Sequence, residues 1–500
     1  MSRIKVLHTA DLHLGVETYG VTNQDGINSR IKDYLETLDW LVLQAKSLDC
    51  DAFLVAGDIF DNERPTNYVI SEFAKRIRNL VDSSITVILT PGNHETSSSS
   101  RVPSALEVFR ALHPQKDGTE IACHVLGCQP SKPGDTETMG GISTIPTKSG
   151  NLQILAMPYP RRSEILTSEQ MKNRGREEVK KLAATIFLDR IQELARKALP
   201  GLPTIFVGHF GIKEAELRPG VKGYLADDVI ISTYDLMSKL SDSQAKFGYV
   251  ALGHYHSPQM PSPNLVAPSL DEDMDGETSI LCGTNPCRDW ELSSNETVAP
   301  DPDSLFRDGK PVRKIQVAYS GAPSRRDFPD GARTRMFMEL DLTPEGSSGK
   351  CRKVEHSRSL RQLTVDNALD WKEELEAKFL KSEFWRQPYE YAATGCGQEQ
   401  IEKTMKGPLP IFRLRLPEEA RSIWPAIKSW LDTLPMFDKI IAPYYKPSAR
   451  ESQKAVIAQT ESPVEAVKSY LDSLQDDFAK TNRARIQEEA ERIMQEARVV

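Results

Sequence analysis

The sequence predicts an α/β fold, and three patterns in the 500-residue chain support this prediction. Apolar strand patterns alternate with helical patterns along the first part of the chain, as they do in β-α-β units. Five short apolar runs end in Gly or Ala followed by a side chain that can bind a metal. Later segments have the patterns of a separate, smaller α+β region. We therefore expect a β-sandwich flanked by helices, then a smaller α+β domain and a helical tail.

The first apolar run, Ile4 to Leu7, leads into Asp11 and His13. A buried strand there would deliver a carboxylate and an imidazole to its carboxyl end. An Asp and a His two positions apart are weak on their own, because such a pair in a loop is more often a chance pair or a helix cap. The interpretation as a metal site depends on whether the pattern recurs.

The pattern recurs four times. Residues 51–55 precede Asp58 and Asp61, residues 85–89 precede Asn93, His94 and Glu95, residues 204–207 precede His209, and residues 249–252 precede His254 and His256. Five of the nine histidines lie in these motifs. Carboxyl ends of parallel strands meet at one edge of a sheet, so we expect one shared site. The alternative, core histidines bonded to strand ends, would have to hold five times. A set of Asp, Asn and His without thiolates suits Mn²⁺, Mg²⁺ or Fe²⁺.

The segments between these runs supply the other elements. An apolar stripe with helical spacing runs through residues 28–48, and Pro65, Thr66 and Asn67 are typical of a helix start. We expect helices over residues 28–48, 68–80, 102–112 and 176–199, a loop or hairpin over 127–150, and a strand over 152–157.

The motifs D-x-H, G-D-x-x-D, G-N-H-E, G-H and G-H-x-H stand in this order in the chain. In combination they resemble the calcineurin-like metallophosphoesterase superfamily. The resemblance implies two divalent ions that share Asp58 as a bridge, with Mn²⁺ the first choice and Mg²⁺ or Fe²⁺ the alternatives. It also implies the remaining ligands: Asp11, His13 and His256 for one ion, and Asn93, His209 and His254 for the other. His94 would be the catalytic residue, as a proton donor to the leaving oxygen or a stabiliser of developing charge.

Finer features resemble SbcD-type nuclease subunits of DNA repair. They are residues 25–34, the P-Y-P of 158–160, residues 247–259 and residues 317–328. This resemblance implies a metal-dependent DNA exonuclease or endonuclease in an SbcCD-like repair or defence complex. It would hydrolyse phosphodiester bonds through a hydroxide activated by two metals. Its partners would be DNA, an SbcC-like coiled-coil ATPase and a second copy of the chain.

Two rival functions stay open at this point. One is a phosphomonoesterase or cyclic-nucleotide phosphodiesterase that uses the same metals on a small substrate, and the other is a scaffold with a vestigial site. Because the chain contains no G-x-x-x-x-G-K-[ST] loop, any ATP-driven step would have to come from a partner. Glu95 departs from the G-N-H-D usual in SbcD-like proteins, and we expect this change to be tolerated.

We expect three regions along the chain. Residues 1–332 would form the nuclease domain, with an acidic insertion of about 260–311 that is either a surface loop or a lid. Residues 333–447 would form a capping domain that begins with the strand 336–342 and continues with a strand at 410–416 and a helix at 418–431. Residues 462–498 would form a helical tail that docks a partner.

The composition is that of an ordinary globular protein, with 39% hydrophobic and 27% charged residues. The opening M-S-R-I-K-V lacks a secretion signal, and no run of about 20 apolar residues occurs. We therefore expect a cytoplasmic protein that does not enter a membrane. The net charge of −8 does not indicate a nucleic-acid binder. Local basic patches, such as Arg161–Arg162 and Arg325–Arg326, do not by themselves identify the substrate-binding residues.

Overall fold

The structure is a computed structural model. It describes residues 3–96, 104–111, 121–127, 134–215, 228–261, 290–293, 297–298, 312–328, 334–382, 384–405 and 408–445. Contacts divide the chain into two compact units. The first comprises Met1–Leu360 with Glu399–Ile411, and the second comprises Arg361–Gln398 with Phe412–Val500.

The first unit contains a mixed seven-stranded sheet. Its strands in spatial order are β11 (Trp290–Ser293), β16 (Gly346–Lys353), β15 (Met336–Thr343), β1 (Ile4–Thr9), β2 (Ala52–Ala56), β3 (Thr86–Thr90) and β4 (Cys123–Val125). From β1 to β4 the strands are parallel, so β1, β2 and β3 end at the same edge. On the other side β15 pairs antiparallel with β1, which places Leu342 opposite Ile4.

A second sheet of five strands completes the sandwich. Its spatial order is β14 (Gln316–Tyr319), β10 (Phe247–Gly253), β7 (Thr204–His209), β6 (Gly150–Met157) and β5 (Gly141–Thr147). The strands β14, β10, β7 and β6 are parallel, and β5 forms an antiparallel hairpin with β6. This hairpin confirms one of the two structures expected for residues 127–150.

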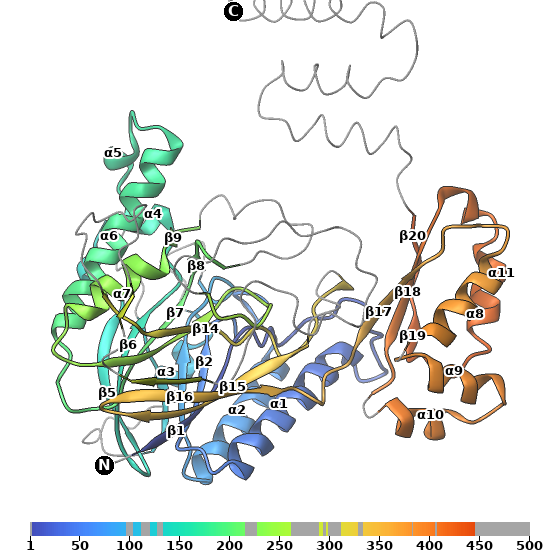
Figure 1. Ribbon diagram of the computed structural model, residues 1–500, viewed down its shortest axis with the longest axis horizontal. Helices are drawn as coiled ribbons and strands as arrows, with labels where there is room; N and C mark the ends of the chain where they lie inside the picture. The colour runs from blue at the N-terminus through green and yellow to red at the C-terminus, as the bar shows by residue number, and fades with distance from the viewer. Residues whose placement is uncertain are drawn as a thin grey trace, which may run out of the picture. The chain divides into compact units, whose positions relative to one another are not determined.

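The two sheets face each other across a shared apolar core. Val6 and Leu54 of the first sheet belong to the same buried cluster as Ile205 and Ala251 of the second. Side chains alternate along a strand, so Leu7 points to the opposite face of its sheet. The outer faces are covered by α1 (Ser29–Ser47) and α2 (Asn67–Asp82) on the first sheet, and by α6 (Arg176–Arg196) and α7 (Thr233–Ser241) on the second (Figure 1).

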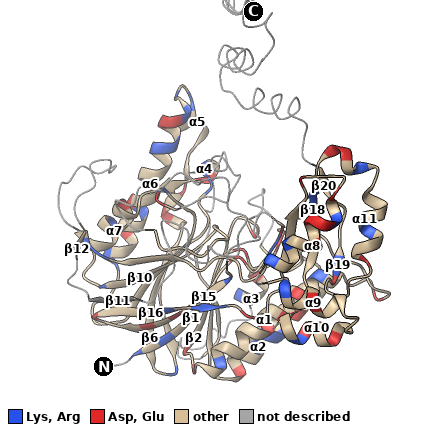
Figure 2. Ribbon diagram, turned by 45° about the vertical axis from the view of Figure 1, so that its right-hand side comes forward, with Lys and Arg blue, Asp and Glu red and all other residues tan. Residues whose placement is uncertain are grey.

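The helices begin where polar caps precede apolar stripes. The Asn28 side chain accepts a hydrogen bond from Arg30 N at the start of α1, and Thr66 accepts one from Val69 N at the start of α2. Basic and acidic residues are interspersed along their solvent sides (Figure 2). Short helices are α3 (Glu107–Ala111), α4 (Arg162–Ile165) and α5 (Ser168–Met171). Among the described helices, none is both long and apolar enough to cross a membrane.

The second unit has a small sheet of its own, and it is rich in aromatic contacts. Its strands are β17 (Leu360–Thr364), β18 (Ile411–Leu416), β19 (Lys439–Ile440) and β20 (Tyr444–Tyr445). Between β17 and β18 the chain forms α8 (Trp371–Lys381), α9 (Arg386–Ala393) and α10 (Gln398–Met405), and α11 (Trp424–Leu431) follows β18. Phe412 and Phe437 stack with ring centroids 4.5 Å apart. A capping role for this unit stays a prediction, and the expected tail 462–498 lies outside the described residues.

Two expectations about the later chain need correction. The strand at 336–342, expected in the capping domain, is β15 of the seven-stranded sheet, because its apolar residues pair with β1. Within the expected insertion 260–311, Trp290–Ser293 forms β11 on β16 rather than a surface loop. The lid alternative concerns residues outside those that the structure describes. Two further short pairs are β8 (Gly211–Ile212) with β9 (Ile230–Ile231), and β12 (Thr297–Val298) with β13 (Val312–Arg313).

Candidate metal centre

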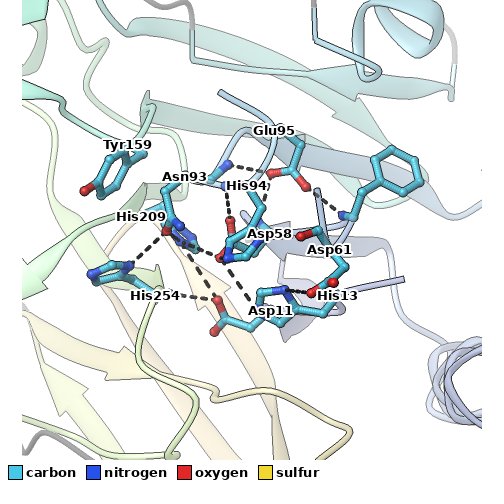
Figure 3. Close-up of polar contacts among 12 residues, drawn as sticks. Asp11, His13, Asp58, Asp61, Asn93, His94, Glu95, Tyr159, His209 and His254 are labelled. Atoms are coloured by element: carbon cyan, nitrogen blue, oxygen red, sulfur yellow. Dashed lines mark hydrogen bonds and ion pairs between the residues drawn. The ribbon is translucent and has the colours of Figure 1, made fainter. Parts of the chain in front are cut away.

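The predicted site residues follow the ends of five strands, β1, β2, β3, β7 and β10, on one rim of the sandwich (Figure 3). Three overlapping groups have ligand atoms within 4.8 Å of one another: Asp11, His13 and His256; His13, Asp58 and His94; and Asp11, Asp58 and His209. Asn93 and His254 join them through hydrogen bonds. All eight residues expected at the site are therefore brought together.

The first ligand group consists of Asp11, His13 and His256. His13 Nε2 lies 2.9 Å from His256 Nε2. Two neutral imidazoles whose ring nitrogens approach this closely need a proton or a cation between them. Asp11 Oδ1 accepts a hydrogen bond from His254 N at 2.9 Å, which links this group to the loop after β10.

The second ligand group consists of Asn93, His209 and His254. Asn93 Oδ1 lies 3.1 Å from His209 Nε2 and 3.1 Å from His254 Nδ1. One amide oxygen and two imidazole nitrogens thus converge from three different strand ends. Such a set of neutral donors can complete the shell of a divalent ion without adding negative charge.

Asp58 lies between the two groups. Its Oδ2 is 3.3 Å from His209 Nε2, 3.8 Å from His13 Nε2 and 3.9 Å from His94 Nε2. The residue is 2% exposed, and its Oδ1 accepts a hydrogen bond from His94 N at 2.9 Å. This is the position that a bridging carboxylate requires.

Four of these residues have left-handed backbone conformations. The φ angles are 53° for Asp11, 44° for His13, 49° for Asp58 and 100° for His254. Non-glycine residues in this region cost about 1–3 kcal/mol each and gather at functional sites. The rest of the fold must hold these turns in place, which aims the side chains at one point.

Glu95 ties two of the ligand-bearing loops together. Its carboxylate accepts hydrogen bonds from the backbone N–H groups of Asp58 at 3.1 Å, Phe60 at 2.7 Å and Gly92 at 2.9 Å. A Cβ at Gly92 would lie 2.2 Å from Asp58 Oδ1, so only glycine allows the loops to approach this closely. Burial and the nearby Asp58 raise the pKa of Glu95 to about 8. Sequence reasoning treated Glu95 only as a tolerated change and missed this contact.

His94 lies at the edge of the cluster. Its Nδ1 is 2.5 Å from the carbonyl oxygen of Asp61, and its side chain is 23% exposed, against 3% for the Asp58 side chain beside it. Because the carbonyl oxygen can only accept, Nδ1 carries the proton and Nε2 faces Asp58. The orientation suits a residue that meets the substrate rather than one enclosed by ligands.

The imidazoles of the second ligand group have protein partners on their other nitrogens. His209 Nδ1 lies 2.9 Å from Ala56 O, and His254 Nε2 lies 3.4 Å from Asp228 Oδ2. The Tyr159 hydroxyl donates to Asp228 Oδ1 at 2.7 Å. Such partners fix the ring orientation of metal-binding histidines. Sequence reasoning missed Asp228. Tyr159 could have been found because it directly follows β6 at the same rim.

The electrostatics of the cluster centre on Asp58. Burial would raise its pKa, but the His209 imidazole outweighs burial and holds the pKa of Asp58 well below its ordinary value. Burial would likewise lower the pKa of His209, but the carboxylates of Asp58 and Asp11 raise it to about 9. Burial lowers the pKa of His13 well below its usual range, and His256 lowers it further although Asp58 opposes this. His13 is therefore neutral, the form in which an imidazole binds metal.

The donor chemistry fits two divalent ions that share Asp58. Carboxylate, amide and imidazole donors are present without a thiolate, which favours Mn²⁺, Mg²⁺ or Fe²⁺ over softer ions. The His13 Nδ1 atom makes no hydrogen bond within the described part of the chain. It lies 3.6 Å from Asp61 Oδ1, so a cation on the Nε2 side would align this pair.

Two facing sheets with a rim of Asp, Asn and His residues define a metallophosphoesterase. The model of the calcineurin-like phosphoesterase family matches residues 4–258, about half of the chain, and the chain belongs to this family. The resemblance stated from the motifs is thereby confirmed.

Curated relatives share the same half of the chain. The chain is 28% identical over 264 residues to the SbcD component of the nuclease SbcCD of Escherichia coli (strain K12), which covers 51% of this chain and 57% of that protein. It is 25% identical over 260 residues to the corresponding SbcCD component of Rhodobacter capsulatus (51% and 58%). It is also 25% identical over 256 residues to the DNA double-strand break repair protein Mre11 of Aeropyrum pernix (51% and 50%). The chain thus spans between half and three fifths of the length of these relatives.

Proposed function

We propose that the protein is a metal-dependent DNA nuclease that hydrolyses phosphodiester bonds. The observation that carries the proposal is the position of Asp58 between two complete ligand groups, with His94 beside it at the exposed edge. Relatives named as components of the nuclease SbcCD and as a DNA double-strand break repair protein support DNA as the substrate class. We assign Mn²⁺ as the ion of first choice, and Mg²⁺ or Fe²⁺ as the alternatives.

The side chains would divide the work of hydrolysis. A pair of bound divalent ions supplies a water of lowered pKa and neutralises charge on the phosphate. Asp58 fixes the spacing of the two ligand groups, because its Oδ2 faces both His13 and His209. His94 would give a proton to the leaving oxygen through Nε2, since Nδ1 is held by Asp61 O. Glu95 keeps the loops that carry Asp58 and Asn93 together.

One assay separates this function from its rivals. The purified chain is incubated with Mn²⁺ and end-labelled duplex or single-stranded DNA, and in parallel with p-nitrophenyl phosphate esters. We expect DNA degradation that a chelator abolishes, with the Asp58→Ala variant as the background control. Hydrolysis of the esters without DNA cleavage would favour a small-substrate phosphoesterase. Bound metal without hydrolysis of either substrate would favour a scaffold.

We further propose that an SbcC-like ATPase and a second copy of the chain are partners. The support is that the relatives named above are called subunits of a complex. The apolar stripe expected in the tail, which includes Leu471 and Leu474, would dock the ATPase. A Leu471→Glu, Leu474→Glu double variant should keep Mn²⁺-dependent cleavage but fail to co-purify with the ATPase. Normal co-purification would contradict the docking role.

A further inference from the structure

The segment that follows β14 is fixed against the first ligand group. Ala322 N donates a hydrogen bond to His256 O at 3.1 Å. Gly321 has φ +71°, and a Cβ there would lie 2.7 Å from His256 O. The segment therefore approaches the loop that bears His256 as closely as backbone atoms allow, and it does so through glycine.

The same segment is also held from the other side by α1. The carbonyl oxygen of Arg325 accepts a hydrogen bond from Arg30 Nη2 at 2.6 Å and another from the Tyr34 hydroxyl at 3.0 Å. Arg30 is 1% exposed, and its Nη1 donates to Asp33 Oδ2 at 2.9 Å. A buried guanidinium directed at a single backbone carbonyl fixes the residue that comes next, because its desolvation is offset only in that geometry.

The next residue, Arg326, points its guanidinium at the site. Arg326 Nη2 lies 3.1 Å from Asp61 Oδ1, and Asp61 in turn contacts both His13 and His94. The Arg326 side chain is 34% exposed, so solvent and a substrate can both reach the group. It is a fixed positive charge at the open edge of the cluster, and Asp61 links it to the proposed proton donor.

We propose that Arg326 is a phosphate-binding residue that holds a non-bridging oxygen of the substrate, with Asp61 orienting its guanidinium. This inference rests on the proposed function and names the contact that selects an anionic phosphodiester chain. A guanidinium offers five N–H donors in a planar fork that matches phosphate geometry. In a chain with net charge −8, a positive group at the site is also what draws a polyanion to it.

The alternative is that Arg326 only stabilises the fold through its ion pair with Asp61. Arg352 offers a matched control, because its Nη2 lies 2.7 Å from Glu339 Oε2 and its side chain is 42% exposed. Glu339 and Arg352 belong to β15 and β16, which carry no residue of the proposed site. An ion pair that is only structural should behave alike in the two places.

The first experiment measures inorganic phosphate binding to the Mn²⁺-loaded chain by calorimetry, which does not depend on any activity. Arg326→Gln should raise the Kd of phosphate by about tenfold to a hundredfold, the size of a charge-assisted hydrogen bond. Arg326→Lys should recover part of the affinity, Arg352→Gln should match the unaltered chain, and metal content should be equal throughout. An unchanged Kd in Arg326→Gln overturns the proposal. So does a loss of folding in Arg326→Gln that lysine repairs together with full phosphate affinity.

The second experiment uses DNA. Arg326→Gln should raise KM more than it lowers kcat, and the slope of log kcat/KM against log salt should fall by about 0.7–0.9, the value for one phosphate contact. Unchanged KM and unchanged salt slope would overturn the role in DNA binding. If the unaltered chain does not cleave DNA, the proposed function fails by itself, and the phosphate measurement still decides the role of Arg326.

Discussion

The imidazoles of the second ligand group are held through their ring nitrogens, by Ala56 O for His209 and by Asp228 for His254. The first ligand group is instead held through its main chain. His13 N donates to Asp58 O, and His256 O accepts from Arg335 Nη1 at 2.9 Å and from Ala322 N at 3.1 Å. The two groups should therefore respond differently to mutation. Ring orientation is set by the protein in the second group and depends more on the bound cation in the first.

The largest effect should come from the residue that both groups share. Asp58→Ala removes the carboxylate that faces His13 and His209, so we expect loss of both ions and of all measurable cleavage. Elemental analysis and the DNA assay measure the two losses separately. Mn²⁺-dependent nuclease activity in a folded Asp58→Ala protein would refute a shared, bridging role.

His94→Ala should show that a residue beside both groups belongs to neither. We expect two ions to stay bound, while cleavage slows by roughly 10²–10⁴, the contribution of a positioned proton donor. The metal content is compared with that of the unaltered chain, and kcat is measured at saturating DNA. If one ion is missing, His94 is a ligand and the division into two groups must be redrawn.

Asp228→Asn tests the support that only the second group has. The amide keeps the size of the side chain but loses the charge that faces His254 Nε2, so metal affinity should fall by about 10–100-fold. Titration with Mn²⁺ should show one weakened site and one site that is nearly unchanged. Equal weakening of both sites would mean that the two groups do not act separately.

Tyr159→Phe should give a smaller change in the same direction. The variant removes the hydroxyl that donates to Asp228 Oδ1 at 2.7 Å, and one such hydrogen bond contributes about 0.5–1.5 kcal/mol. We expect the same ion to bind up to about tenfold more weakly. Tyr249→Phe is a suitable control, because its hydroxyl contacts the buried His8 rather than a ligand of the site. A larger loss in Tyr159→Phe than in Asp228→Asn would assign Tyr159 a role of its own.

The sequence predicted the ligands because each follows an apolar strand, and strand ends carry a local signal. The confirmed helices α1, α2 and α6 likewise follow from caps and periodic apolar residues. Asp228, Glu95 and Arg326 were not predicted as site residues, because their roles arise from contacts between distant segments. Asp228 meets His254 across 26 residues, Glu95 meets Asp58 across 37, and Arg326 meets Asp61 from a different sheet. No spacing in the chain encodes these pairs.

The domain boundary expected at residue 332 failed for a related reason. The strand Met336–Thr343 has an apolar pattern that fits either domain, and only its pairing with β1 decides between them. The hairpin with β16 then brings β11 into the same sheet. Antiparallel pairing between strands more than 300 residues apart leaves no periodic trace in the sequence.

The pairing of β1 with β15 has a consequence for the order in which the protein can assemble. The N-terminal strand gains its neighbour β2 early in synthesis, but Ile4 must wait for Leu342. At the usual 5–20 residues per second, that wait is roughly 17–70 s. During this time the edge of β1 is open to pairing with other chains. A fragment that ends at residue 332 would contain every proposed ligand and would keep this edge open permanently, so we expect it to aggregate where the full chain does not.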